Sequence, residues 1–63
     1  MKYKLIIDNG KPYEVVVNSD DELRTELNKL KAQSEQENHY IDVWVFNDQE
    51  EEITDSQFIQ EMI

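Results

Sequence analysis

The chain has 63 residues, with 15 Asp and Glu against 6 Lys and Arg, which gives a formal net charge of -9 at pH 7. A chain of this length buries only a thin core, so the sequence predicts one small domain over residues 1–63 and argues against a large active-site cleft. There is no Cys, which excludes disulfides, thiolate catalysis and Cys-based zinc sites. No segment approaches the roughly 20 apolar residues of a membrane span, and the first residues lack the pattern of a signal peptide, so we expect a cytoplasmic protein.

The acidic residues are placed unevenly along the chain. All of the Lys and Arg residues fall within residues 1–31, whereas residues 32–63 contain nine acids and no Lys or Arg. Binding to nucleic acid or to an anionic membrane requires clustered cations that release counterions, so neither partner is expected. The simplest interpretation is that the charge keeps a small protein in solution, and the functional alternative is attraction to a partner with a basic surface.

Two strands are predicted at the start of the chain. Apolar residues alternate over residues 3–7 and again over residues 13–17, which is the period of a strand with one buried face. Pro12 lacks a backbone N–H, so the second strand is predicted to lie at an edge of the sheet.

Two registers compete for the hairpin that joins these strands. A two-residue turn at Asn9 and Gly10 would place Glu14 on the apolar face, which makes a poor core. A three-residue loop over residues 8–10 keeps that face apolar, and it is the register that we predict. It pairs Tyr3 with Val15 and Leu5 with Tyr13, and on the opposite face it pairs Lys4 with Glu14.

A helix is predicted to begin at Ser19. Ser19 and Glu22 have the spacing of a capping box, in which each side chain accepts a hydrogen bond from the backbone N–H of the other residue. A single apolar stripe follows, made by Leu23, Leu27 and Leu30. The polar stretch 34–39 contains no Gly and is predicted to end the helix and form a loop.

Residues 40–46 form the strongest predicted strand, because they are rich in β-branched and aromatic side chains. Its two faces carry Ile41, Val43 and Val45 on one side and Tyr40, Asp42, Trp44 and Phe46 on the other. After it, Thr54 and Gln57 have capping-box spacing for a short last helix. That helix would carry Phe58, Ile59, Met62 and Ile63.

The order strand, strand, helix, strand, helix predicts an α+β fold, ββαβα, with a three-stranded antiparallel sheet of order 2-1-3. The main helix covers one face of that sheet. The other face is left with an apolar patch of Tyr40, Trp44, Phe46, Ile6 and Val16. Three interpretations stay open for this patch: the short C-terminal helix folds across it, another protein chain covers it, or a small molecule binds there.

Few residues could carry catalysis. His39 is the single His and lies in a predicted loop, and Gly10 is the single Gly, so there is neither a nucleophile elbow nor a phosphate-binding loop. The acidic segment 48–55 fails as a calcium loop, because Ile53 occupies the position that requires Gly. We therefore predict a protein that is not an enzyme and uses no cofactor and no metal.

The charge and the aromatic residues together suggest a role in protein–protein interaction. We hypothesise a regulator or inhibitor that presents a nucleic-acid-like negative surface to a protein with a basic surface, with Trp44 as the main apolar anchor. The predicted partner-binding residues are Tyr40, Asp42, Trp44, Phe46, Asp48, Glu50, Glu51 and Glu52. The alternative is a homodimer or an assembly subunit that associates through the third strand and its aromatic face.

Overall fold

The computed structural model describes residues 2–62, so the predicted contribution of Ile63 to the core lies outside the described residues. The elements are β1 (Tyr3–Asp8), β2 (Pro12–Val17), α1 (Asp20–Glu37), β3 (Asp42–Phe46) and α2 (Gln57–Gln60). The strands form one antiparallel sheet in the order β2-β1-β3. The predicted α+β fold and strand order are therefore confirmed, and Pro12 does lie on an edge strand.

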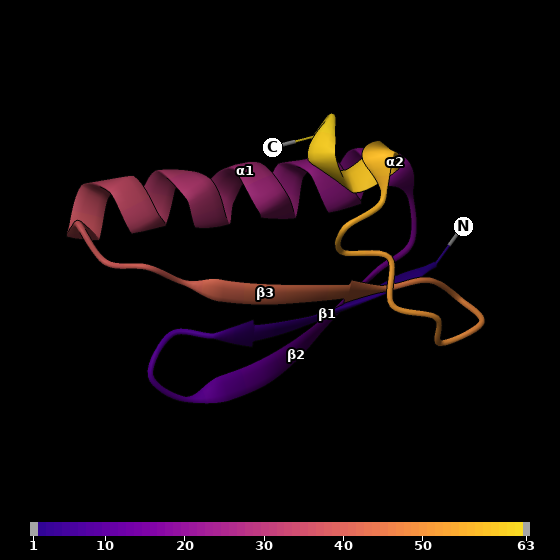
Figure 1. The fold of residues 1–63 in the computed structure, drawn as a ribbon, viewed down its shortest axis with the longest axis horizontal. Helices are drawn as coiled ribbons and strands as arrows, with labels where there is room; N and C mark the ends of the chain where they lie inside the picture. The colour runs from indigo at the N-terminus through magenta and orange to yellow at the C-terminus, as the bar shows by residue number, and fades with distance from the viewer. Residues whose placement is uncertain (1, 63) are drawn as a thin grey trace.

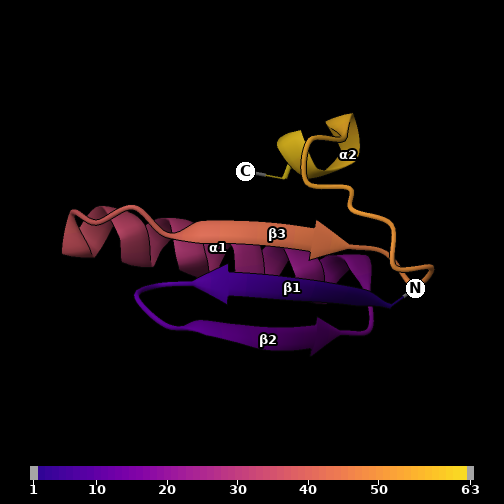
Figure 2. The same cartoon turned by 60° about the horizontal axis from the view of Figure 1, so that its bottom comes forward.

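Both helices lie on the same side of the sheet. Figure 1 shows α1 running along one face, with α2 close to the first half of α1. Figure 2 views the opposite face, and none of the described elements lies in front of it. The molecule is thus a two-layer structure with one covered and one uncovered sheet face.

The predicted hairpin register is wrong by two residues. In the structure Tyr3 faces Val17 and Asp8 faces Pro12, so the connecting loop is 9–11 rather than 8–10. Asp8 stays in the strand because its Oδ1 accepts a hydrogen bond from the backbone N–H of Gly10 at 3.1 Å, which closes the turn from the strand end. Gly10 adopts the left-handed region with φ 93, which other residues avoid.

A shift of two residues keeps every side chain on its predicted face, so the core composition is unaffected. It does change the cross-strand neighbours. Leu5 faces Val15 rather than Tyr13, and Lys4 faces Val16 rather than Glu14, so the predicted Lys4–Glu14 pair does not form. The register that is adopted brings Val17 into the core beside Tyr3, and both side chains are buried.

Helix α1 begins as predicted at Ser19, whose Oγ accepts a hydrogen bond from the backbone N–H of Glu22 at 3.1 Å. The return bond differs from the prediction, because the Glu22 carboxylate accepts from the N–H of Asn18 at 3.0 Å instead of from that of Ser19. The end of the helix also differs. It continues to Glu37 and is closed by Asn38, which takes the left-handed conformation at φ 51 that a Gly would otherwise supply.

The left-handed cap at Asn38 leads to a stability prediction. Asn38→Ala is expected to lower the free energy of unfolding by about 1 kcal/mol, because a Cβ-bearing residue without a short polar side chain is strained at positive φ. Asn38→Gly should be tolerated. The control is Asn28→Ala, where the same change in the middle of α1 should stabilise slightly, since Ala is the better helix former. Equal losses at both positions in urea denaturation would contradict this account.

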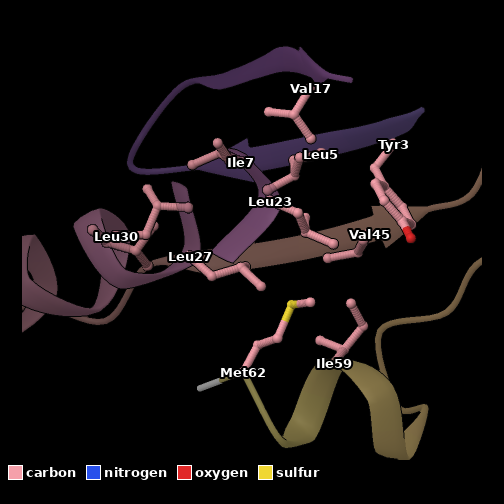
Figure 3. Packing of buried hydrophobic residues seen from close by; sticks show 11 residues of the cluster. Tyr3, Leu5, Ile7, Val17, Leu23, Leu27, Leu30, Val45, Ile59 and Met62 are labelled. Carbon is pink, nitrogen blue, oxygen red and sulfur yellow. The ribbon is translucent and has the colours of Figure 1, made fainter. Parts of the chain in front are cut away.

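The core lies between the sheet and the two helices. The apolar stripe of α1 is buried as predicted, and Figure 3 shows Ile59 of α2 and Met62, which follows the helix, pointing toward Val45 and Leu27. The buried cluster consists of Tyr3, Leu5, Ile7, Val17, Leu23, Leu27, Leu30, Ile41, Val45, Ile59 and Met62. Helix α2 therefore extends the core on the side of α1.

The position of α2 settles one of the alternatives left open by the sequence. Because Ile59 and Met62 are used in the core, the helix does not fold across the aromatic patch, and that interpretation is wrong. Its N-cap is Ser56 rather than Thr54. The Thr54 hydroxyl instead accepts a hydrogen bond from the backbone N–H of Val45 at 2.9 Å, which ties the preceding segment to the edge of β3.

Candidate functional site

The open face is our name for the sheet surface opposite α1. Residues opposite one another in an antiparallel sheet point to the same side, so the strand register arranges this face in three rows across the sheet. The rows are Val16–Lys4–Phe46, Glu14–Ile6–Trp44 and Pro12–Asp8–Asp42. The first two rows carry its apolar side chains, and the last row carries two carboxylates.

Two of these apolar side chains are substantially exposed. Trp44 has 38% of its surface accessible and Val16 has 48%. Ile6 and Phe46 are half-buried by their neighbours on the same face. A partly exposed tryptophan on an uncovered sheet face is a costly exposure for an isolated domain, and it is the kind of residue that dominates binding at protein interfaces.

Lys4 connects the open face to the acidic segment that follows β3. Its Nζ lies 5.5 Å from the centroid of the Phe46 ring, a cation–π contact. The same Nζ lies 3.8 Å from Oε1 of Glu50. The glutamate is highly exposed, so this ion pair contributes little to stability. This ion pair matters for the position of Glu50, because Lys4 holds the Glu50 carboxylate near the Phe46 ring.

The acidic loop, residues 47–52, has a defined backbone conformation. The Asn47 Oδ1 accepts hydrogen bonds from the backbone N–H groups of Gln49 and Glu51, both at 2.9 Å. Glu50 takes the left-handed conformation at φ 62, and its N–H donates to the Asn47 carbonyl at 3.1 Å. Phe46 and Glu52 face each other in an isolated antiparallel bridge, so the Glu52 side chain lies on the open face.

The structure brings most of the predicted partner-binding residues together. Asp42, Trp44, Phe46 and Glu52 lie on the open face, and Glu50 adjoins it through Lys4. Asp48 and Glu51 are exposed on the same loop. Tyr40 is the exception, because it precedes β3, is 79% exposed, and lines a groove on the helix side of the sheet.

That groove lies between the second half of α1 and the outer edge of β3, and it has a volume of about 550 Å³. Its apolar lining comes from both helices and from the strand, and it includes Leu27, Leu30, Ile41, Val43, Val45 and Ile59. No local sequence pattern indicates this groove. Each lining residue, taken alone, is typical of a buried core position, and the space between them exists because of where α2 packs.

Among residues 2–62, one titratable group has a clearly shifted pKa, and its role is structural. Burial of the Tyr3 ring raises the pKa of its hydroxyl to about 12, and the hydroxyl also donates a 2.7 Å hydrogen bond to Oδ1 of Asp20, whose negative charge acts in the same direction. The charge of Asp48 adds a smaller effect. Because Tyr3 lies in the core beneath α1, this shift marks a stabilising contact rather than a reactive group.

Within residues 2–62, no three His, Asp or Glu side chains gather closely enough to hold a metal ion. The same range contains no helix of sufficient length and apolarity to cross a membrane. No protein family model matches the chain, and neither a curated protein nor a solved structure shows significant similarity to it.

Proposed function

We propose that this protein acts by binding another protein, and that its open face and acidic loop together form the contact surface for a basic target. The observation that carries the proposal is the exposed Trp44, in a sheet face left uncovered by α2 and next to a loop of four acids. In this role it is a regulator or inhibitor without enzymatic activity.

The aromatic side chains of the open face supply the apolar part of such a contact. Trp44 and Phe46 lie on β3 in neighbouring rows, with Ile6 and Val16 beside them. Side chains held on a sheet lose little conformational freedom on binding. The free energy gained by burying them against a partner is therefore offset less by lost entropy. Trp is among the residues most often found at the energetic centre of an interface.

The acidic loop supplies the charged part. Of its four acids, only Glu50 has a salt bridge within residues 2–62, so the other carboxylates are available to a cationic partner. A row of carboxylates beside a flat apolar face would occupy the same basic surface as a nucleic acid backbone. Complementary charge also accelerates association, and this effect weakens with added salt.

The proposal is tested with a partner captured at low salt on the immobilised protein. Trp44→Ala is expected to raise the dissociation constant by roughly 30-fold, as for a central interface aromatic. The control is Tyr13→Ala, which removes a comparably exposed aromatic from the other face of the sheet. Glu51→Gln with Glu52→Gln should reduce the dependence of affinity on salt, and DNA should compete for the partner. Binding that ignores both Trp44→Ala and salt would disprove the proposal.

The second candidate is a homodimer formed through the third strand and the aromatic face. It is favoured by the same exposed Trp44, since a self-complementary apolar face is buried when two copies meet. It is opposed by repulsion between two chains that each carry a charge of -9. Sedimentation at high protein concentration and raised salt tests it, and a monomer under both conditions would remove it.

A further inference from the structure

The outer edge of β3 is closed at one end and open at the other. Beside Val45, the N–H of Ile53 donates to the Val45 carbonyl at 2.8 Å, and the Val45 N–H donates to the Thr54 hydroxyl at 2.9 Å. The segment that leads to α2 thus covers the edge at this residue. Figure 2 shows that segment and α2 beside the end of β3, and no described segment beside its beginning.

The uncovered part of the edge contains free backbone hydrogen-bonding groups. In an antiparallel strand, residues two apart direct their N–H and C=O groups to the same side. Since Val45 directs both groups away from β1, Val43 does so as well. Within residues 2–62 nothing bonds the N–H or C=O of Val43. An exposed pair of this kind is a template for an added strand.

The groove lies directly beside this free edge, because Val43 belongs to both and Ile41, the residue before β3, also lines the groove. A strand added to a sheet edge places alternate side chains on each face of the sheet. Those on the helix side would enter the apolar groove between the second half of α1 and β3. The edge therefore offers the two components of strand addition: backbone bonds for affinity and a pocket for one side chain.

We propose that the open half of the β3 edge binds an extended, basic segment of a partner protein as a fourth strand, with an apolar side chain of that segment in the groove. The charge of the surroundings selects this occupant. The exposed carboxylates of Glu35 and Asp55 line the groove, Lys31 is the one cation there, and no Lys or Arg follows it in the chain. On the helix side of the sheet, a segment with one apolar residue in the groove and a cation two positions before and after it matches both the groove and its two carboxylates.

Other occupants satisfy fewer of these features. A small apolar molecule would fill the groove but would leave the Val43 N–H and C=O unbonded. A second copy of the chain could pair edge to edge, yet two chains of charge -9 repel each other. The β3 edge with its groove and the open face are different surfaces, so either of the two binding proposals can fail while the other stands.

The test uses the ¹⁵N-labelled protein and a synthetic acetylated peptide in which Lys, Val and Lys, separated by single Thr residues, share one face of the extended chain. On titration, the amide resonance of Val43 should shift, and its hydrogen exchange should slow. Methylating alternate peptide nitrogens on the pairing edge should weaken binding at least about tenfold, because the lost backbone bonds each contribute to affinity. The same peptide with Glu in place of both Lys residues should not bind.

A pair of charge reversals separates this site from general attraction to an acidic protein. Glu35→Lys with Asp55→Lys should abolish binding of the basic peptide, whereas Glu14→Lys with Glu50→Lys makes the same charge change at the open face and should retain most of it. Circular dichroism checks that both variants fold. The comparison with the methylated peptide uses the unsubstituted protein, so it does not depend on the folding of any variant.

Four results would overturn the proposal. They are absence of binding by the basic peptide, equal binding by the methylated peptide, equal loss in the two charge-reversal variants, and resonance shifts confined to the open face. Dimerisation without peptide, accompanied by protection of the Val43 amide, would assign the edge to a second copy instead.

Discussion

Leu23→Ala is expected to remove about half of the free energy of unfolding. Leu23 is completely buried at the centre of the apolar stripe of α1. Truncation of such a leucine costs about 2–5 kcal/mol through lost burial and the cavity that remains. A domain of this size has a total stability of only about 3–9 kcal/mol, from the usual stability per residue. The middle of both ranges puts the loss at about half of that stability, and far-ultraviolet circular dichroism in urea measures it.

Arg24→Ala is the matched control for this substitution. Arg24 is the next residue of α1 and is exposed, and Ala is as good a helix former as Arg. The control should therefore unfold at the same urea concentration as the unsubstituted protein. Similar midpoints for the two variants would mean that the stripe of α1 does not form the core.

The second large effect is a loss of stability at alkaline pH. The pKa of Tyr3 rises from 10.0 in the unfolded chain to about 12 in the folded protein, because of burial and the Asp20 carboxylate. The folded state therefore holds this proton more tightly than the unfolded state. The resulting stability is fully present below pH 10.0 and is lost as the pH rises to about 12. The loss amounts to about 2–3 kcal/mol, from the usual free energy per pKa unit.

Tyr3→Phe isolates this contribution. Near neutral pH the variant should be less stable by about 1–2 kcal/mol, because the hydrogen bond to Asp20 is missing. Above pH 10.0 the unsubstituted protein weakens and the variant lacks this loss, so the order of stability should reverse before the pH reaches about 12. Tyr13→Phe, at an exposed tyrosine, should produce no reversal. Parallel stability curves for Tyr3→Phe and the unsubstituted protein would contradict the assignment.

The strands and the first helix could be predicted because their signals are local. Alternating apolar residues define which face of β1 and β2 is buried, and leucines at helical spacing define the buried stripe of α1. The hairpin register could not be obtained in the same way. A two-residue shift leaves the alternation unchanged, so the choice depends on the Asp8–Gly10 hydrogen bond and on the burial of Val17.

The sequence predicts the apolar side chains of the open face, but it does not predict whether α2 covers them. The sequence shows that β3 is apolar on both sides, but an amphipathic turn carrying Ile59 and Met62 could cover either one. Tertiary contacts determine where α2 packs. Hydrogen bonds from Val45 to Thr54 and from Ile53 to Val45 hold the preceding segment along the edge of β3, and the chain continues from there to the side of α1. The groove arises from the same docking, so no local pattern could have indicated it.

The single tryptophan of the chain lies on the open face, away from the groove. This placement makes the indole an intrinsic optical reporter of the open face. A partner that covers Trp44 should shield the ring from a soluble quencher, whereas a peptide strand added at the β3 edge lies beside the ring and should leave most of it accessible to the quencher. An unlabelled sample in a fluorimeter can thus reveal which side of the sheet a newly found ligand occupies.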